Sequence, residues 1–194
     1  MVKYKQNFTK RKNMKYVICS DIHGDLDGAR LALEAMEREC ADRLILLGDI
    51  LYHGPRNALP HSYDPKAVIE LLNKNKEKIL AVRGNCDTEV DQMVLDFPIL
   101  ADYAFLDVDG LRIFATHGHK HGRDNPPPIS SGEILLTGHT HIPAIERLEG
   151  GAYYVNPGST SIPKGNFERS YATLYEGKIE IKNFSGGVIF SQRF

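Results

Sequence analysis

Several features that would place a chain in a specialised class are scarce or missing in this sequence. Among 194 residues there is no tryptophan, and the three cysteines, Cys19, Cys40 and Cys86, form no CxxC pair. An odd number of scattered cysteines argues against a disulfide framework and favours a reducing, cytoplasmic location. No stretch approaches the roughly 18 consecutive apolar residues of a membrane-spanning helix, so we expect no membrane association.

The charge balance argues against another class of function. Twenty-four basic residues stand against 25 acidic ones, which gives a formal net charge of -1. A general nucleic-acid-binding protein usually carries a basic stripe, and this composition gives no indication of one. With 42% hydrophobic and 25% charged residues, the chain has the composition of an ordinary soluble globular protein.

Residues 1–13 differ from the rest of the chain. They are polar and aperiodic, and no apolar region follows their lysine and arginine residues, so they do not resemble a secretory signal. We expect a disordered or tag-like N-terminal extension there. The remaining length is typical of one domain, which we expect to span residues 14–194.

The first half of the chain repeats the order strand, loop, helix. Short apolar runs predict buried strands at residues 16–20, 43–47 and 78–82. Apolar residues at helical spacing follow Asp25, and Pro65 is well placed to open a second helix. This alternation favours a mostly parallel sheet with crossover helices.

The second half of the chain is rich in strands. Residues 103–108 and 111–116 flank the turn signal Asp109-Gly110, which predicts a β-hairpin. Further strands are expected at residues 134–137, 144–148, 153–156, 171–175 and 178–184. The pattern alone therefore indicates an α/β fold with a strand-rich second half.

Side chains of the kinds that bind metal ions directly follow five of these strands. They are Asp21, His23, Asp49, Asn85, His117, His139 and His141. Each alone is more commonly a turn residue or a hydrogen-bonded side chain, but sites in α/β sheets form beyond the carboxyl ends of strands. Carboxylate, amide and imidazole donors together suit octahedral Mn²⁺, Fe²⁺ or Zn²⁺. Seven ligands are too many for one ion, and one shared carboxylate would divide them between two.

These residues also form ordered sequence motifs that are similar to those of a known family. Five motifs resemble those of the calcineurin-like metallophosphoesterases: Asp21-x-His23, Gly48-Asp49, Gly84-Asn85-Cys86-Asp87, His117-Gly118-His119 and Gly138-His139-x-His141. Residues 53–60, Cys86 and residues 156–159 resemble the bacterial YfcE phosphodiesterases in particular. The resemblance covers the chain from Met14 to the mid-180s. It implies a four-layer α-β-β-α sandwich of two mixed sheets.

The resemblance also implies a dinuclear centre with two divalent metal ions. Mn²⁺ is the ion expected first, and Fe²⁺, Zn²⁺ and Ni²⁺ are alternatives. One ion would be bound by Asp21, His23 and His141, the other by Asn85, His117 and His139, and Asp49 would bridge the two. A hydroxide between the ions would attack phosphorus, so no side chain would act as the nucleophile.

Three further residues are candidates for supporting catalytic roles. His119 lies two residues beyond His117 and would contact phosphate or support a metal ligand. Arg56 would clamp a phosphate oxygen with its guanidinium group. Cys86 stands where many members of the superfamily have a histidine. It would be a thiolate, an oxidisable switch or a small hydrophobic residue, and we favour the last of these.

The expected activity is hydrolysis of a small phosphoester, with a phosphodiester as the favoured substrate. A phosphomonoesterase or nucleotide pyrophosphatase would use the same centre, because specificity lies in the surrounding loops. A non-catalytic scaffold of the same fold, as in the retromer subunit of eukaryotes, is the less favoured alternative, since all seven ligand positions are retained. Exposed strand edges in the second half suggest a homodimer or homotetramer.

Overall fold

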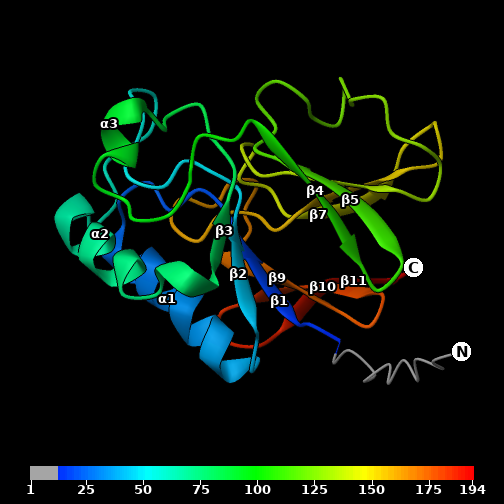
Figure 1. Cartoon of the computed structure of the whole chain (residues 1–194), viewed down its shortest axis with the longest axis horizontal. Coiled ribbons are helices and arrows are strands. Elements are labelled where there is room, and N and C mark those ends of the chain that lie inside the picture. Colours follow the sequence, from blue (N-terminus) through cyan, green and yellow to red (C-terminus); the bar gives the residue numbers. More distant parts are fainter. Residues whose placement is uncertain (1–12) are drawn as a thin grey trace, which may run out of the picture.

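Two β-sheets stacked face to face form the centre of the computed structural model, which describes residues 13–194 (Figure 1). One sheet has six strands in the order β11-β10-β9-β1-β2-β3, and the other has five in the order β4-β5-β6-β8-β7. The strands are β1 Tyr16–Cys19, β2 Arg43–Leu46, β3 Ile79–Ala81, β4 Tyr103–Val108, β5 Leu111–Thr116, β6 Ile134–Leu136, β7 Ala144–Arg147, β8 Tyr153–Asn156, β9 Ser170–Tyr175, β10 Lys178–Asn183 and β11 Val188–Arg193.

Both sheets are mixed, as expected. Strands β1, β2 and β3 run parallel, whereas β9 is antiparallel to β1. In the second sheet β5, β6 and β8 are parallel, and β4 and β7 pair antiparallel at the two edges. Each sheet therefore contains three parallel strands, and the loops that follow their carboxyl ends can contribute to one site.

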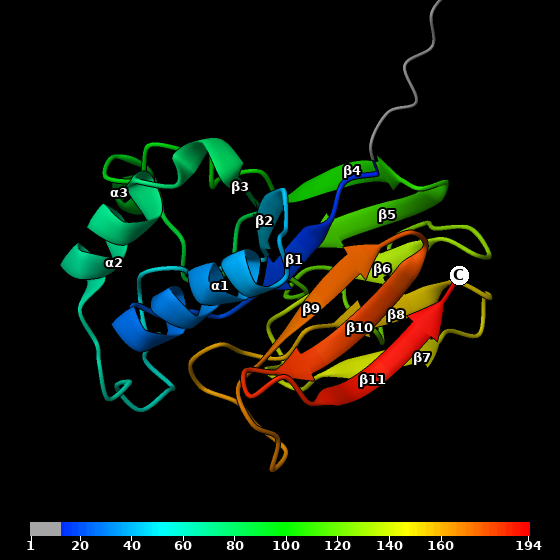
Figure 2. The ribbon, with the colours of Figure 1, turned by 90° about the horizontal axis from the view of Figure 1, so that it is seen from below.

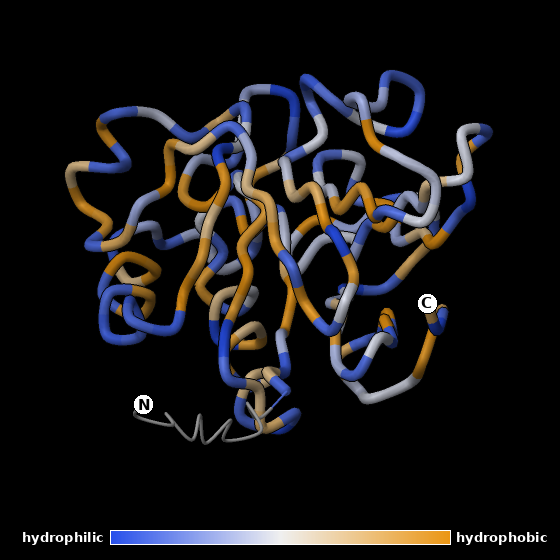
Figure 3. Tube along the Cα trace, turned by 45° about the vertical axis from the view of Figure 1, so that its right-hand side comes forward, coloured by the Kyte–Doolittle hydropathy of each residue, from blue (hydrophilic) through white to orange (hydrophobic). Residues whose placement is uncertain are grey.

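The strands of the first sheet are buried on both faces, which explains their continuous apolar sequences. Successive side chains of a strand point to opposite faces. In β1, Val17 and Cys19 pack in the cluster beneath the helices, whereas Ile18 packs in the cluster between the two sheets. Figure 3 shows the apolar residues concentrated along the strands and the hydrophilic ones mostly in the loops.

The helices lie beside the six-stranded sheet (Figure 2). They are α1 Leu26–Arg38, α2 Pro65–Asn73 and α3 Glu89–Gln92, with a short 3-10 helix at Lys76–Lys78. In α1 the small residues Ala29, Ala32 and Ala35 are fully buried, and the helix packs on β1 and β2. Helix α2 begins at Pro65, as predicted, and the Asp64 carboxylate accepts a hydrogen bond from the backbone of Ala67.

The outer face of the five-stranded sheet is covered differently from the expected arrangement. The two mixed sheets and the helix layer on the first sheet are confirmed, but no helix follows Gln92 within residues 13–194. In place of the second helix layer, the loop after β5 contributes Ile129, which packs against Phe114, Leu135 and Tyr154. The fold is thus a two-sheet sandwich with helices on one side and a loop on the other.

Some details of the chain differ from, or lie beyond, the sequence-based expectations. Helix α3 and the last strand β11 were not predicted, and β11 pairs antiparallel with β10. Apart from Asn13, the expected N-terminal extension lies outside the described residues, and a single domain over residues 14–194 stays a prediction. Across the described part of the chain, no helix has the length and apolar character needed to cross a membrane.

Candidate metal centre

The seven predicted ligands meet where the loops of the two sheets come together. Those from the six-stranded sheet follow β1, β2 and β3, and those from the five-stranded sheet follow β5 and β6; they are Asp21, His23, Asp49, Asn85, His117, His139 and His141. The backbone N–H of His139 donates to the Asp21 carboxylate over 3.0 Å, which links the two sheets directly. The loops after β5 and β6 are linked by Gly138, whose N–H donates to the carbonyl of His117 over 2.8 Å.

One group of ligand atoms surrounds Asp21. Its Oδ1 lies 3.3 Å from Nε2 of His141 and 3.6 Å from Nε2 of His23. The two Nε2 atoms are themselves 3.3 Å apart. All three side chains are buried, and their ligand atoms lie within 4.8 Å of one another, close enough to share one cation.

A second group of ligand atoms surrounds His117. Its Nε2 lies 3.1 Å from Oδ1 of Asn85 and 3.2 Å from Nδ1 of His139. Oδ2 of Asp49 lies 3.5 Å from the same nitrogen and 3.7 Å from Nε2 of His23. Asp49 therefore stands between the two groups, where a bridging ligand would have to lie.

Backbone carbonyls fix the orientation of three of the imidazoles. Nδ1 of His23 lies 2.8 Å from the Tyr52 carbonyl, Nδ1 of His117 lies 2.6 Å from that of Leu47, and Nδ1 of His141 lies 2.6 Å from that of Ile162. A carbonyl only accepts, so in a neutral imidazole the proton is on Nδ1 and the Nε2 lone pair faces the centre.

This arrangement fits a bound cation. Nε2 of His23 and Nε2 of His141 face each other at 3.3 Å, and neither has a proton to offer in the neutral tautomer. Fully buried Oδ1 of Asp21 has no hydrogen-bond partner among the described residues. Lone pairs converging in this way are stabilised by a metal ion between them, and the carbonyl contacts behind them are the usual supports of metal-binding histidines.

The backbone of the ligand residues is strained. Five of the seven have positive φ between 52° and 67°: Asp21, His23, Asp49, His139 and His141. Left-handed backbone is uncommon in residues other than glycine, and it persists at functional sites where the surrounding structure imposes it. The left-handed turns directly after the strands are therefore a feature of the candidate site.

Asp87 and Gly84 position the central carboxylate of Asp49. Oδ2 of Asp87 accepts hydrogen bonds from the N–H groups of Asp49 and Gly84 over 2.8 and 2.7 Å. The N–H of Cys86 donates to Oδ1 of Asp49 over 2.8 Å. A Cβ atom at position 84 would collide with the Asp49 carboxylate, so glycine is required there.

The charges of the site favour the binding of a cation. Burial raises the pKa of Asp21, but its contacts with His141 and His23 hold that pKa well below its usual value. Burial lowers the pKa of His117, yet the contact with Asp49 and the charge of Asp21 raise it to about 9. The buried carboxylates therefore keep their negative charge. Without a metal ion, they favour the protonated form of His117.

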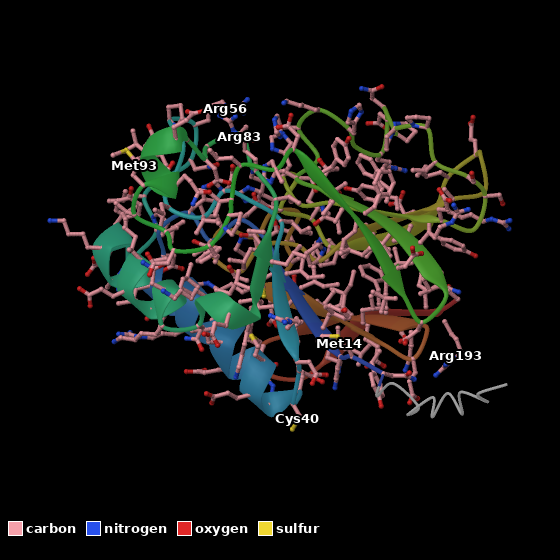
Figure 4. The ribbon with its side chains drawn as sticks, in the orientation of Figure 1. Met14, Cys40, Arg56, Arg83, Met93 and Arg193 are labelled. Carbon is pink, nitrogen blue, oxygen red and sulfur yellow. The ribbon has the colours of Figure 1, made fainter. Side chains whose placement is uncertain are left out.

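The supporting candidates fall in two neighbouring cavities. Arg56 and Cys86 line a cavity of about 440 Å³ together with four of the ligands, Asp49, Asn85, His139 and His141. His119 instead lines a separate cavity of about 370 Å³, although its ring centroid is 5.4 Å from that of His117. Figure 4 shows Arg56 at the upper margin of the molecule.

Lys164, which was not predicted, also lines the cavity over the ligands. Its backbone N–H donates to the carbonyl of His141 over 3.1 Å, so its position depends on a ligand residue. The available signal was its place shortly after residues 156–159, which fold against the ligand loops: Asn156 donates to the Gly138 carbonyl, and Ser159 donates to that of Asp21.

Residues 14–178 match the calcineurin-like phosphoesterase superfamily domain, and the chain belongs to this superfamily. It is 48% identical over 161 residues to the phosphodiesterase YfcE of Escherichia coli strain K12, covering 83% of this chain and 87% of that protein. The solved structure of the E. coli phosphoesterase Yfce aligns with a TM-score of 0.89 at 43% identity, over 93% of this chain and 99% of that one.

More distant relatives share the fold. The phosphodiesterase MJ0936 of Methanocaldococcus jannaschii is 30% identical over 153 residues, covering 75% of this chain and 83% of that protein. The Vps29 structure from Chaetomium thermophilum aligns over 93% of this chain and 97% of that one, with a TM-score of 0.56 at 14% identity. At this identity the likeness to Vps29 concerns the fold alone.

Proposed function

We propose that this protein is a metal-dependent phosphodiesterase that hydrolyses a small phosphodiester at a centre of two divalent ions, with Mn²⁺ as the ion expected first. One observation carries the proposal: two groups of ligand atoms face inward, and Oδ2 of Asp49 lies between them, near both His23 and His117. Two ions held there would supply a hydrolytic water of lowered pKa and positive charge for the phosphate oxygens.

Residues of the chain would position the ions and bind the substrate. Asp49 would bridge the two ions. The backbone carbonyls that contact Nδ1 of His23, His117 and His141 would hold the Nε2 atoms of these histidines in the orientation that binds metal. Arg56, which lines the cavity over these ligands, would bind an anionic group of the substrate through charge-assisted hydrogen bonds. This assembly needs no nucleophilic side chain.

A diester substrate is favoured over a monoester by the named relatives. YfcE of E. coli and MJ0936 are both phosphodiesterases by name, and the chain covers more than four fifths of each. The test is turnover of bis-p-nitrophenyl phosphate and p-nitrophenyl phosphate by chelator-treated protein, with and without added Mn²⁺. Turnover of the diester that requires the metal and exceeds turnover of the monoester is the expected result.

The other outcomes of this assay decide between the alternatives. Faster hydrolysis of the monoester would identify a phosphatase or nucleotide pyrophosphatase with the same centre. No turnover with Mn²⁺, Fe²⁺, Zn²⁺ or Ni²⁺ would favour a non-catalytic scaffold, the role for which intact ligand positions are least needed. Metal analysis by mass spectrometry, run on the same samples, gives the number of ions per chain.

Two further parts of the proposal concern the protein as a whole. A cytoplasmic location is supported by Cys19, Cys40 and Cys86, which are all free thiols. A homodimer or homotetramer is supported by the edge strand β4, where Tyr103 is 52% and Phe105 is 70% exposed. Light scattering of the purified protein tests the assembly, and a monomer at micromolar concentration would contradict it.

A further inference from the structure

Two cations line the cavity over the metal centre without a carboxylate partner. They are Arg56, from the loop after β2, and Lys164, from the loop after β8. Neither forms an ion pair with any residue of the described chain, residues 13–194. The cations of the neighbouring cavity differ in this respect, since Arg123 lies 2.7 Å from Glu146 and Lys120 lies 2.9 Å from Asp102.

The backbone at both cations is attached to the metal centre. Gly54 has a φ of +78°, and a Cβ atom there would lie 3.2 Å from Sγ of Cys86, so the loop carrying Arg56 rests on this thiol. Asn57 closes the loop by donating from Nδ2 to the carbonyl of His53 over 2.8 Å. The loop carrying Lys164 is tied to a metal ligand through its backbone hydrogen bond to His141.

The charges at the metal centre balance without Arg56 and Lys164. Two divalent ions bring four positive charges, against the ligand carboxylates of Asp21 and Asp49 and one hydroxide expected between the ions. The bridging phosphate of a diester carries one negative charge, which balances this sum. Asp49 is the one carboxylate among the residues that line the cavity, so the positive charges of Arg56 and Lys164 remain in excess. Specific sites are complementary in charge to their ligands, and this complementarity contributes to specificity and to the rate of association.

We propose that Arg56 and Lys164 form a subsite for a second anionic group, carried on one ester arm of the substrate. The substrate class is then a phosphodiester with a carboxylate or a further phosphate near the scissile phosphate. This inference rests on the proposed phosphodiesterase activity and specifies the substrate of that same centre.

The experiment compares two diesters that differ in one charge. Both are 4-nitrophenyl phosphate esters; one has a propyl arm and the other a 2-carboxyethyl arm, and a third with a phosphate at the end of an ethyl arm separates the two kinds of anion. With Mn²⁺-loaded protein, kcat/KM should be about fivefold to tenfold higher for the charged arms, the range expected for one or two exposed ion pairs.

The variants Arg56→Met and Lys164→Met should each lower this preference, and the double variant should bring the ratio close to one. Lys74→Met is the matched control, because it removes an exposed cation at the end of α2, outside the cavity, and should leave the ratio unchanged. Calorimetric binding of phosphonoacetate and ethylphosphonate to the same proteins gives a comparison that does not depend on turnover.

Three outcomes would count against the proposal in distinguishable ways. Equal kcat/KM for neutral and charged arms in the unmodified protein would overturn the anion subsite while leaving phosphodiesterase activity intact. A uniform loss on all substrates in the variants would also overturn it, since the cations would then act on the scissile phosphate. Hydrolysis of none of the diesters with any divalent ion would instead contradict the proposed function itself.

Discussion

The carboxylate of Asp87 accepts a hydrogen bond of 2.8 Å from the backbone N–H of Asp49 and thereby ties the loop after β3 to the loop after β2. Its other oxygen accepts from Ile50 over 2.9 Å. In return, the N–H of Cys86 donates to the Asp49 side chain over 2.8 Å. The two loops thus hold each other through reciprocal contacts, and the side chain between both ligand groups has little freedom to turn.

Substitution of Asp87 by asparagine should therefore weaken metal binding without removing a ligand. An amide offers one acceptor oxygen where the carboxylate offers two, so one of the backbone N–H groups loses its partner. We expect a 10- to 100-fold loss of Mn²⁺ affinity, as is usual for residues that orient metal ligands. Calorimetric titration with Mn²⁺ measures this affinity. Asp96→Asn, at an exposed position, is the control, and equal affinities in the two variants would refute this role.

Asp49→Asn should disable both metal positions together. The substitution removes the negative charge that lies near His23 and His117, so both ligand groups lose it at once. We expect fewer than one bound Mn²⁺ per chain and a loss of diester hydrolysis of about 100-fold or more. Asn85→Ala should lower only the occupancy of the group around His117. Elemental analysis after dialysis decides; full activity with two bound ions in Asp49→Asn would contradict the bridging role.

The convergence of the seven candidate ligands could be predicted because few residue types bind metal ions and these stand at recognisable positions. Carboxylates and imidazoles placed directly after buried strands are few, and parallel strands bring their carboxyl ends to one edge. Lys164 carries no such signal. A lysine in a loop is usually a solvated residue, and only its place shortly after residues 156–159 pointed to the centre, beside which a backbone hydrogen bond to His141 holds it.

Other features that differed from the expectations also lack a clear local sequence signal. A helix layer over the second sheet was expected from the resemblance, whereas the loop containing Ile129 buries that face with few apolar residues. Strand β11 has only partial burial along its length, so its hydrophobic alternation is weak and gave no prediction. His119 was expected to contact phosphate or support a metal ligand; its ring centroid lies 5.4 Å from that of His117, and it lines the neighbouring cavity.

Cys86 should behave as a neutral thiol in the metal-free protein. Burial, reinforced by the charge of Asp49, raises its pKa to about 12, so the thiolate is scarce at neutral pH. Cys40, which is exposed, provides an internal standard. We expect iodoacetamide at pH 8 to modify Cys40 at least about tenfold faster than Cys86, as measured by peptide mass spectrometry. Faster labelling of Cys86 would favour an activated thiolate.

The pH dependence of stability should include a contribution from Glu39, which lies away from the metal centre. Its carboxylate accepts hydrogen bonds from Nζ of Lys15 over 2.7 Å, from Nζ of Lys182 over 2.9 Å and from the hydroxyl of Tyr171 over 2.9 Å. Burial raises its pKa, but these contacts outweigh the burial and lower the pKa to about 2. The folded state therefore favours the ionised form.

Because the pKa is lower in the folded protein, this contribution is fully present above the unfolded value of about 4.5 and is lost as the pH falls toward 2. Glu39→Gln should lower the free energy of unfolding by about 1 to 3 kcal/mol at pH 7, and the difference from the unmodified protein should shrink at pH 3. Urea unfolding of the metal-free proteins at both pH values measures this. Glu149→Gln, at an exposed position, should show no such difference, and a Glu39→Gln effect of equal size at both pH values would show that packing, rather than charge, is responsible.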